Sequence, residues 1–183
     1  MIDFICSASE KSGFPPTEKE VVFVGRSNVG KSSLINALYQ QKIAYVGKKP
    51  GKTRLINFFD ADGLYTAVDV PGYGYAQRSQ KEMIAFAKMM DDYFSRYDKI
   101  RLTVMIVDSR HGLTGDDEDM KEYLEGRKIP YVIAANKIDK LSNNQLMNNK
   151  NRLFKDMNNV IYVSAQTRKN MDQLKERIME SVR

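Results

Sequence analysis

Residues 25–32 of the chain are GRSNVGKS, in which a glycine and four further residues precede a second glycine, a lysine and a serine. Glycine permits tight turns whose successive N–H groups point at one anion, and a helix N-terminus adds a partial positive charge. In this spacing the Lys31 ammonium can reach terminal phosphates, and the Ser32 hydroxyl can bind a magnesium ion held between them. The pattern is that of a P-loop. It predicts nucleotide contacts from Gly25, Arg26, Ser27, Asn28, Val29, Gly30, Lys31, Ser32 and Ser33.

A second motif, DVPG, begins with Asp69 near the end of the apolar run 64–70. We expect the Asp69 carboxylate to bind Mg²⁺ through a water molecule and the Gly72 amide to meet a γ-phosphate. By itself such a motif is equally typical of a plain turn. Its position after a P-loop favours the phosphate and magnesium site.

A third motif, NKID, follows the apolar run 131–135. The Asp139 carboxylate can accept two hydrogen bonds from the N1–H and amine of guanine, whereas adenine would present a lone pair to it. Lys137 would lie beside the base and ribose, and Asn136 would brace the loop. Further along the chain, the backbone of Ser164 and Ala165 could contact the base. These residues predict a guanine nucleotide rather than an adenine nucleotide.

Residues 50–53, PGKT, lie between the P-loop and DVPG. The Thr53 hydroxyl could close over the γ-phosphate and bind magnesium, with Gly51 and Lys52 as neighbouring nucleotide contacts. An ordinary loop threonine is the alternative interpretation. The predicted catalytic residues are Lys31, Thr53 and Gly72, and the predicted metal ligands are Ser32, Thr53 and, through water, Asp69.

The elements that must position these motifs alternate between strand and helix patterns. A turn at Asp60-Ala61-Asp62-Gly63 predicts an antiparallel hairpin, while the other strands need helical crossovers. The predicted fold is therefore an α/β, three-layer α/β/α sandwich with a six-stranded, mostly parallel sheet and one antiparallel hairpin strand. The strands are expected at 21–25, 54–60, 64–70, 101–108, 129–135 and 159–163.

The 183 residues suit one domain, and the single cysteine excludes an internal disulfide framework, so cytoplasm is the expected compartment. No apolar run approaches the roughly 18 residues of a membrane span. The formal charge is +6 and the pI is about 9.3. Residues 42–54 hold five Lys or Arg and no acidic residue. This charge fits either a nucleic-acid partner or a solvated surface.

The stretches GRSNVGKSSLINAL, KPGKTRLINFF, DVPGYGYA and DSRHGLTGDD together resemble the EngB (YihA/YsxC) family of bacterial ribosome-assembly GTPases. This family lies in the Era-like branch of the translation-factor GTPases, and the resemblance extends from about residue 4 to the C-terminus. It implies a P-loop NTPase with a Ras-like G domain that spans residues 1–183, in which residues 1–20 pack on the domain as an extension. It also implies Mg²⁺-dependent GTP hydrolysis, slow without a partner, by a monomer that binds the large ribosomal subunit or its precursor.

Tyr73 stands directly after Gly72, where Ras-like proteins place a water-orienting glutamine. Asn28 resembles the asparagine with which potassium-dependent relatives hold a monovalent cation, so K⁺ at Asn28 is a further hypothesis. Asn136 stands where the EngB family more often has threonine, although asparagine is usual there among GTPases. The main hypothesis is a GTPase switch in ribosome assembly. The alternative is a small GTPase switch with a protein effector and no direct RNA contact.

Overall fold

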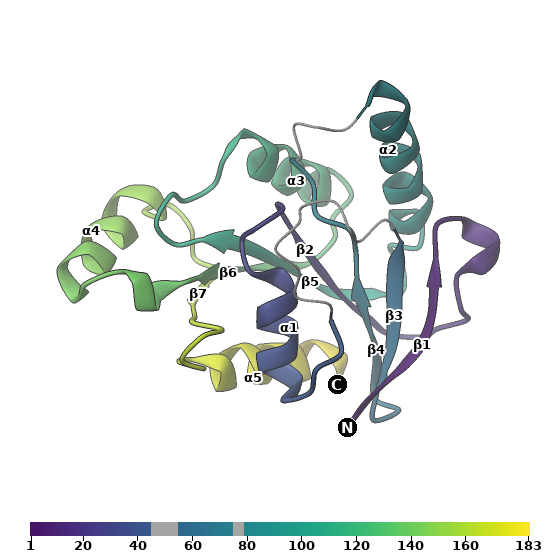
Figure 1. Cartoon of the computed structure of the whole chain (residues 1–183), viewed down its shortest axis with the longest axis horizontal. Coiled ribbons are helices and arrows are strands. Elements are labelled where there is room, and N and C mark those ends of the chain that lie inside the picture. The colour runs from purple at the N-terminus through teal and green to yellow at the C-terminus, as the bar shows by residue number, and fades with distance from the viewer. Residues whose placement is uncertain (45–54, 75–78) are drawn as a thin grey trace.

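The computed structural model describes residues 1–44, 55–74 and 79–183, and within them seven strands form one sheet in the order β1-β3-β4-β2-β5-β6-β7 (Figure 1). The strands are β1 (Ile2–Ala8), β2 (Glu20–Gly25), β3 (Ile56–Ala61), β4 (Tyr65–Asp69), β5 (Ile100–Asp108), β6 (Tyr131–Asn136) and β7 (Val160–Tyr162). The helices are α1 (Lys31–Tyr39), α2 (Gln80–Phe94), α3 (Gly115–Gly126), α4 (Asn143–Leu153) and α5 (Met171–Val182), with 3₁₀ turns η1 (Lys11–Gly13) and η2 (Ile138–Lys140).

The sheet is mostly parallel, as the sequence predicts. Among the described strands, only β3 runs opposite to all the others, and it pairs antiparallel with both of its neighbours, β1 and β4. The turn between β3 and β4 places Asp62 at φ 55° and Gly63 at φ 67°. These left-handed values suit a tight hairpin turn, and the Leu64 amide closes it on the Ala61 carbonyl at 3.0 Å.

The predicted number of six strands is wrong, because residues 2–8 form the edge strand β1 in addition to the six strands expected. A bulge between Phe4 and Cys6 interrupts its register against β3. Phe4 and Ile5 are exposed, so the apolar residues do not alternate as they would in a strand with one buried face. Part of the segment expected to pack as an extension is therefore built into the sheet.

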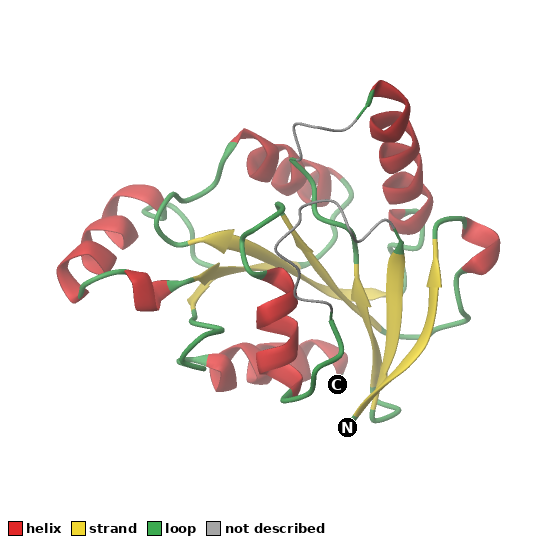
Figure 2. Cartoon of the chain, viewed as in Figure 1, coloured by secondary structure: helices red, strands yellow, loops and turns green. Residues whose placement is uncertain are grey.

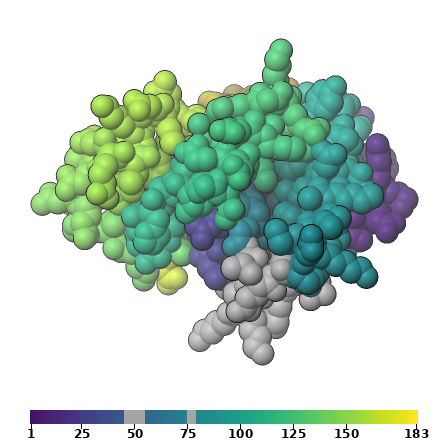
Figure 3. All heavy atoms as spheres, turned by 90° about the horizontal axis from the view of Figure 1, so that it is seen from above, coloured from purple at the N-terminus to yellow at the C-terminus, as the bar shows by residue number. Residues whose placement is uncertain are grey.

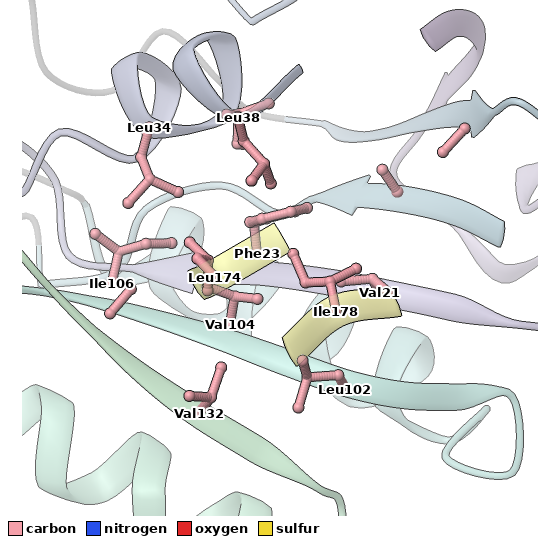
Figure 4. Close-up of a cluster of buried hydrophobic side chains, with 14 of the residues drawn as sticks. Val21, Phe23, Leu34, Leu38, Leu102, Val104, Ile106, Val132, Leu174 and Ile178 are labelled. Atoms are coloured by element: carbon pink, nitrogen blue, oxygen red, sulfur yellow. The ribbon is translucent and has the colours of Figure 1, made fainter. Parts of the chain in front are cut away.

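Helices cover both faces of the sheet, which confirms the three-layer α/β/α architecture (Figure 2). On one face, Leu34 and Leu38 of α1 and Leu174 and Ile178 of α5 pack over the central strands (Figure 4). The other face packs against α2 and against residues of α3 and the end of α4. In the space-filling view, α4 and the N-terminal segment lie at opposite ends of the molecule (Figure 3). None of the described helices has the length and apolar character needed to span a membrane.

The carboxyl ends of the parallel strands lie together at one edge of the sheet. Phe23 of β2 is opposite Asp69 of β4, and Asp108 of β5 is opposite Asn136 of β6. Ligands of open α/β sheets bind outside this edge. The strand order therefore brings the predicted motifs together although up to about 140 residues separate them in the chain.

The opposite edge of the sheet, where the parallel strands begin, holds a buried polar cluster. Glu20, at the start of β2, is fully buried and lies 2.6 Å from a guanidinium nitrogen of Arg96. The Tyr93 hydroxyl donates to the same carboxylate at 2.6 Å, and Thr17 donates to its other oxygen. The Arg96 guanidinium also lies over the Phe14 ring, 5.6 Å from its centroid. This cluster ties the segment before β2 to the end of α2.

Candidate functional site

The loop between β2 and α1 has the backbone geometry of an anion-binding turn. Asn28 has φ 70° and Gly30 has φ 91°, so left-handed residues alternate along the loop before α1 begins at Lys31. Such alternation turns successive N–H groups toward one concave face. A Cβ at Gly30 would lie 2.6 Å from Nδ2 of Asn136, and one at Gly25 would lie 2.8 Å from a backbone oxygen of β5. Close packing thus requires both glycines.

A buried ion pair joins the first residue of α1 to the last residue of β4. The Lys31 ammonium donates to the Asp69 carboxylate, and the two residues are 8% and 3% exposed. Each charge would be costly to bury alone, and the pair compensates both. Two residues predicted for the same site are in direct contact.

The NKID loop is fastened to the P-loop by two hydrogen bonds. Asn136 donates from Nδ2 to the Val29 carbonyl at 3.1 Å, and the Lys137 ammonium donates to the Asn28 carbonyl at 2.7 Å. Asn136 also accepts a hydrogen bond from the Ala165 amide at 3.0 Å. The loop that carries Asp139 is therefore held beside the loop that carries Lys31.

Asp139, in η2, is oriented by the side chain of Ser164, for which only a backbone contact to the base was predicted. The Ser164 hydroxyl donates to one Asp139 carboxylate oxygen at 2.7 Å, and Ser164 is fully buried. The Thr167 amide in turn donates to the Ser164 hydroxyl at 3.0 Å. Sequence reasoning gave Ser164 a backbone role only, because nothing in the sequence shows that β7 ends beside η2.

The DVPG motif lies against the P-loop. The Tyr73 amide donates to the Gly25 carbonyl at 3.3 Å, and the Ser27 amide donates to the Tyr73 carbonyl at 3.1 Å. A Cβ at Gly72 would lie 3.1 Å from the Ser27 nitrogen. The Tyr73 hydroxyl donates to the buried Asp117 carboxylate at 2.7 Å. Burial, together with the Asp117 charge, raises the pKa of Tyr73 well above its usual range, so the phenol remains a donor.

Comparisons with known proteins agree with this geometry. The family model described as "50S ribosome-binding GTPase" matches residues 20–137. The chain is 38% identical over 179 residues to the probable GTP-binding protein EngB of Kosmotoga olearia, covering 94% of each chain. It is 40% identical over 183 residues to that of Bdellovibrio bacteriovorus, covering 98% of this chain and 92% of the relative. The chain belongs to the EngB family of GTP-binding proteins.

Solved structures extend the comparison to the fold of this EngB-family chain. A crystal structure of a probable GTP-binding protein engB superposes with a TM-score of 0.73 and 28% identity, covering 89% of this chain and 98% of that one. Era of Aquifex aeolicus, bound to GDP and AlF4⁻, matches with a TM-score of 0.71 at 22% identity over 90% of this chain and 56% of that one. The second likeness shows the G-domain fold alone.

Asp108, at the end of β5, is a polar residue of this EngB-family site that sequence reasoning missed. It pairs with Lys137 at 3.1 Å and accepts two hydrogen bonds from the Arg110 guanidinium, at 2.9 and 2.7 Å. Burial alone raises the pKa of Asp108, but the hydrogen bonds from Arg110 and Lys137 outweigh it and hold this pKa well below its usual range. The sequence signal for a polar site residue here was the triplet DSR, residues 108–110, which carries two charges and follows a buried strand.

Several predicted residues lie outside the described part of the chain. They include the predicted nucleotide contacts of the PGKT motif and the cations of the basic stretch that follow Lys42. The residues concerned are Gly51, Lys52 and Thr53, together with Lys48, Lys49 and Arg54.

Proposed function

We propose that this EngB-family protein hydrolyses GTP and uses its nucleotide state to control docking on the large ribosomal subunit during assembly. The supporting observation is the contact between the P-loop and the NKID loop, through Asn136 and Lys137. A guanine nucleotide has its phosphates and its base at opposite ends, so its two recognition loops must be held at a fixed separation. The side-chain hydrogen bonds between these loops fix that separation.

The buried pair of Lys31 and Asp69 suggests how the two residues respond to nucleotide. In the proposal, Lys31 transfers its hydrogen bond from the carboxylate to the β- and γ-phosphates, which carry more charge. Asp69 would then be free to hold a water ligand of Mg²⁺, and the Ser32 hydroxyl would be a direct ligand of the ion. These are the oxygen donors that magnesium prefers, and the ion when bound neutralises charge on the phosphates. Thr53 is proposed as the further protein ligand.

Hydrolysis requires a water molecule in line with the γ-phosphate, and the surroundings of that phosphate must hold it in place. The Gly72 amide is proposed to contact the phosphate, with Gly51 and Lys52 beside it. The side chain of Tyr73 is bonded to Asp117, so it does not replace the glutamine of Ras-like proteins. We therefore expect slow hydrolysis without a partner.

A potassium ion at Asn28 is a further part of the proposal, because it could offset the negative phosphate charge that an arginine stabilises in other GTPases. We expect faster hydrolysis in potassium than in sodium, and an Asn28→Ala variant that loses the difference. Equal turnover of the unmodified protein in both salts would remove the potassium site.

The ribosomal part of the proposal is supported by the family and by charge. The matched family model is that of a 50S ribosome-binding GTPase, and the chain carries a formal charge of +6. Lysine and arginine bind RNA phosphates and release counterions, which makes such binding sensitive to salt. We propose a cytoplasmic monomer in which residues 1–183 form one G domain.

One observation favours the alternative, a switch with a protein effector and no direct RNA contact. Met83 and Ile84, near the start of α2, are 58% and 65% exposed. Adjacent exposed apolar side chains on the helix that follows the DVPG motif could form part of a protein contact. Co-sedimentation with large subunits separates the two hypotheses, since phosphate contacts weaken steeply with salt and an apolar interface does not.

The experiment compares a non-hydrolysable GTP analogue, GDP and no nucleotide at several salt concentrations. We expect the strongest binding with the GTP analogue, a steep loss with salt, and weaker binding in all states for a Lys48→Glu/Lys49→Glu variant. A smaller preference for the GTP analogue in Thr53→Ala would link the nucleotide to docking. Absence of subunit binding in every nucleotide state at low salt would contradict the ribosomal role.

A further inference from the structure

A buried hydrogen bond connects the residue after the DVPG motif to the start of α3. The Tyr73 hydroxyl donates to Oδ1 of Asp117 at 2.7 Å, and the two residues are 6% and 1% exposed. The other oxygen of Asp117 accepts from the amide and the hydroxyl of Thr114, each at 2.9 Å. Thr114 is the N-cap of α3, and Asp117 completes its capping box. The phenol is therefore attached to a helix start that is itself fixed.

Tyr73 is also held at its backbone, by the P-loop. Its amide donates to Gly25 and its carbonyl accepts from Ser27, at 3.3 and 3.1 Å. A residue bonded at both its backbone and its side-chain tip has little freedom to move. Tyr73 thus connects two segments that are distant in sequence, the P-loop that follows β2 and the first turn of α3.

The next residue, Gly74, packs against the same helix start. It has φ 69°, and a Cβ there would lie 2.5 Å from Oδ2 of Asp116 and 3.2 Å from Nε of Arg26. Arg26, in the P-loop, lies 4.0 Å from the same Asp116 oxygen. Tyr73 therefore contacts Asp117, and Gly74 packs against Asp116. The stretches DVPGYGYA and DSRHGLTGDD, which are separate in the sequence, meet at this point.

We propose that Tyr73 is a positioning residue, whose hydrogen bond to Asp117 holds the adjacent Gly72 amide where a γ-phosphate binds. This inference rests on the proposed function, in which the Gly72 amide contacts that phosphate. A donor that is fixed before the ligand arrives loses less conformational freedom on binding, so the anchored amide binds more tightly. GDP has no γ-phosphate, and its affinity does not depend on this amide. The Tyr73–Asp117 bond therefore increases the preference for GTP over GDP.

The test uses Tyr73→Phe, which removes one oxygen and keeps the ring. With Mg²⁺ present, we expect its affinity for a non-hydrolysable GTP analogue to fall about fivefold, the factor typical of one lost hydrogen bond. Its affinity for GDP should stay within about twofold of the unmodified protein. An Asp117→Asn variant should change in the same direction, and the double variant should lose less than the sum of the two single losses.

The matched control is Tyr131→Phe, which breaks another tyrosine–carboxylate bond to the same helix. Tyr131, which is half-buried at the start of β6, donates from its hydroxyl to the exposed Glu125 of α3 at 2.6 Å. We expect no change in the affinity of this variant for either nucleotide. A thermal melt of each variant separates loss of folded protein from loss of affinity.

Unchanged affinity of Tyr73→Phe for the GTP analogue would overturn the inference. An equal loss for GDP and the GTP analogue would also overturn it, because the bond would then shape the P-loop as a whole. If the unmodified protein bound neither nucleotide, the proposed function would fail instead, so the two failures are distinguishable.

Discussion

The amino ends and the carboxyl ends of the parallel strands, called here the amino edge and the carboxyl edge of the sheet, each bury an ion pair. The two pairs are built differently. At the amino edge, the Glu20 carboxylate is bonded by Thr17, from the segment just before β2, and by Tyr93 and Arg96, from the end of α2. At the carboxyl edge, within the described residues, the Lys31 ammonium is bonded to Asp69. The side chains of Arg96 and Lys31 are similarly buried, at 10% and 9% exposure. Burial alone therefore does not distinguish a structural ion pair from one that a ligand can replace.

The difference lies in the number of partners and in where they come from. The Arg96 guanidinium also donates to the Pro15 carbonyl at 3.0 Å and to the Thr17 hydroxyl at 2.6 Å, so its removal would cost the segment before β2 several contacts at once. Lys31 begins a helix directly after a loop in which Asn28 and Gly30 are left-handed, a geometry typical of anion-binding turns. We infer that the amino-edge cluster stabilises the fold and that the carboxyl-edge pair is exchanged for phosphate.

The largest effect is expected from Arg96→Ala. Removing the guanidinium leaves the fully buried Glu20 without its cation, which should lower the free energy of unfolding by about 3–5 kcal/mol. Denaturant titration measures this loss. Well below the melting temperature, the Kd for GDP should stay within about twofold of the unmodified protein.

Arg127→Ala is the matched control for that variant. Arg127 pairs with the exposed Asp91 at 2.5 Å and lies over the Tyr123 ring, yet its side chain is 36% exposed. Its loss should cost less than about 1 kcal/mol. Equal destabilisation by the two substitutions would contradict a structural role specific to the amino-edge cluster.

Lys31→Ala should differ from Arg96→Ala in that its main effect is on nucleotide affinity. We expect GTP and GDP affinities to fall by about a hundredfold or more, because a buried, charge-assisted contact to the phosphates is lost. The circular dichroism spectrum should remain that of a folded protein, and Ser32→Ala should weaken Mg²⁺-dependent binding in the same assay. Near-normal affinity in both variants would show that this loop does not hold the phosphates.

A smaller change is expected at the base. Asp139→Asn should lower GTP affinity by about 1–3 kcal/mol and raise affinity for XTP, since an amide can donate to the xanthine carbonyl. Ser164→Ala leaves the carboxylate in place without its orienting donor, so its GTP affinity should fall about threefold to tenfold. Competition with GTP, XTP and ATP measures both. Full GTP selectivity in Asp139→Asn would mean that Asp139 does not recognise the base.

The smallest effect concerns the acid dependence of stability at Asp108. Because its folded-state pKa is lowered, the ionised carboxylate contributes stability above the ordinary carboxyl pKa, and this contribution is lost as the pH falls through the folded-state pKa. The melting temperatures of the unmodified protein and Asp108→Asn should therefore differ most near neutral pH and converge below about pH 4. Thermal melts across that range test the sign, and a gap that widens in acid would refute it.

Local patterns in the sequence were sufficient to predict much of the molecule. The P-loop, the DVPG motif and the hairpin at Asp62-Gly63 are each encoded in a few adjacent residues, and the structure places all three at strand ends as expected. The predicted Asp69 and Lys31 could be assigned to one site because parallel strands end at a common edge. The fold class and the EngB resemblance followed from such motifs.

Contacts between distant segments could not be predicted in this way. The bonds from Tyr73 to Asp117 and from Ser164 to Asp139 join residues 44 and 25 positions apart, and each residue alone is unremarkable in sequence. The Glu20 cluster was missed for the same reason. The strand β1 was missed because its bulge breaks the alternation on which strand prediction depends.

The pairing of β1 with β3 has a consequence for solubility. All six residues of β3, INFFDA, have partners in β1, from Ile56 opposite Ala8 to Ala61 opposite Ile2. Without that cover, the outer N–H and C=O groups of an aromatic strand would form an open edge, which is a template for pairing with other chains. The bulge and the exposed Asp3 make β1 itself a poor template. We therefore expect the cover that β1 gives to β3 to lower the tendency of this edge to pair with other chains.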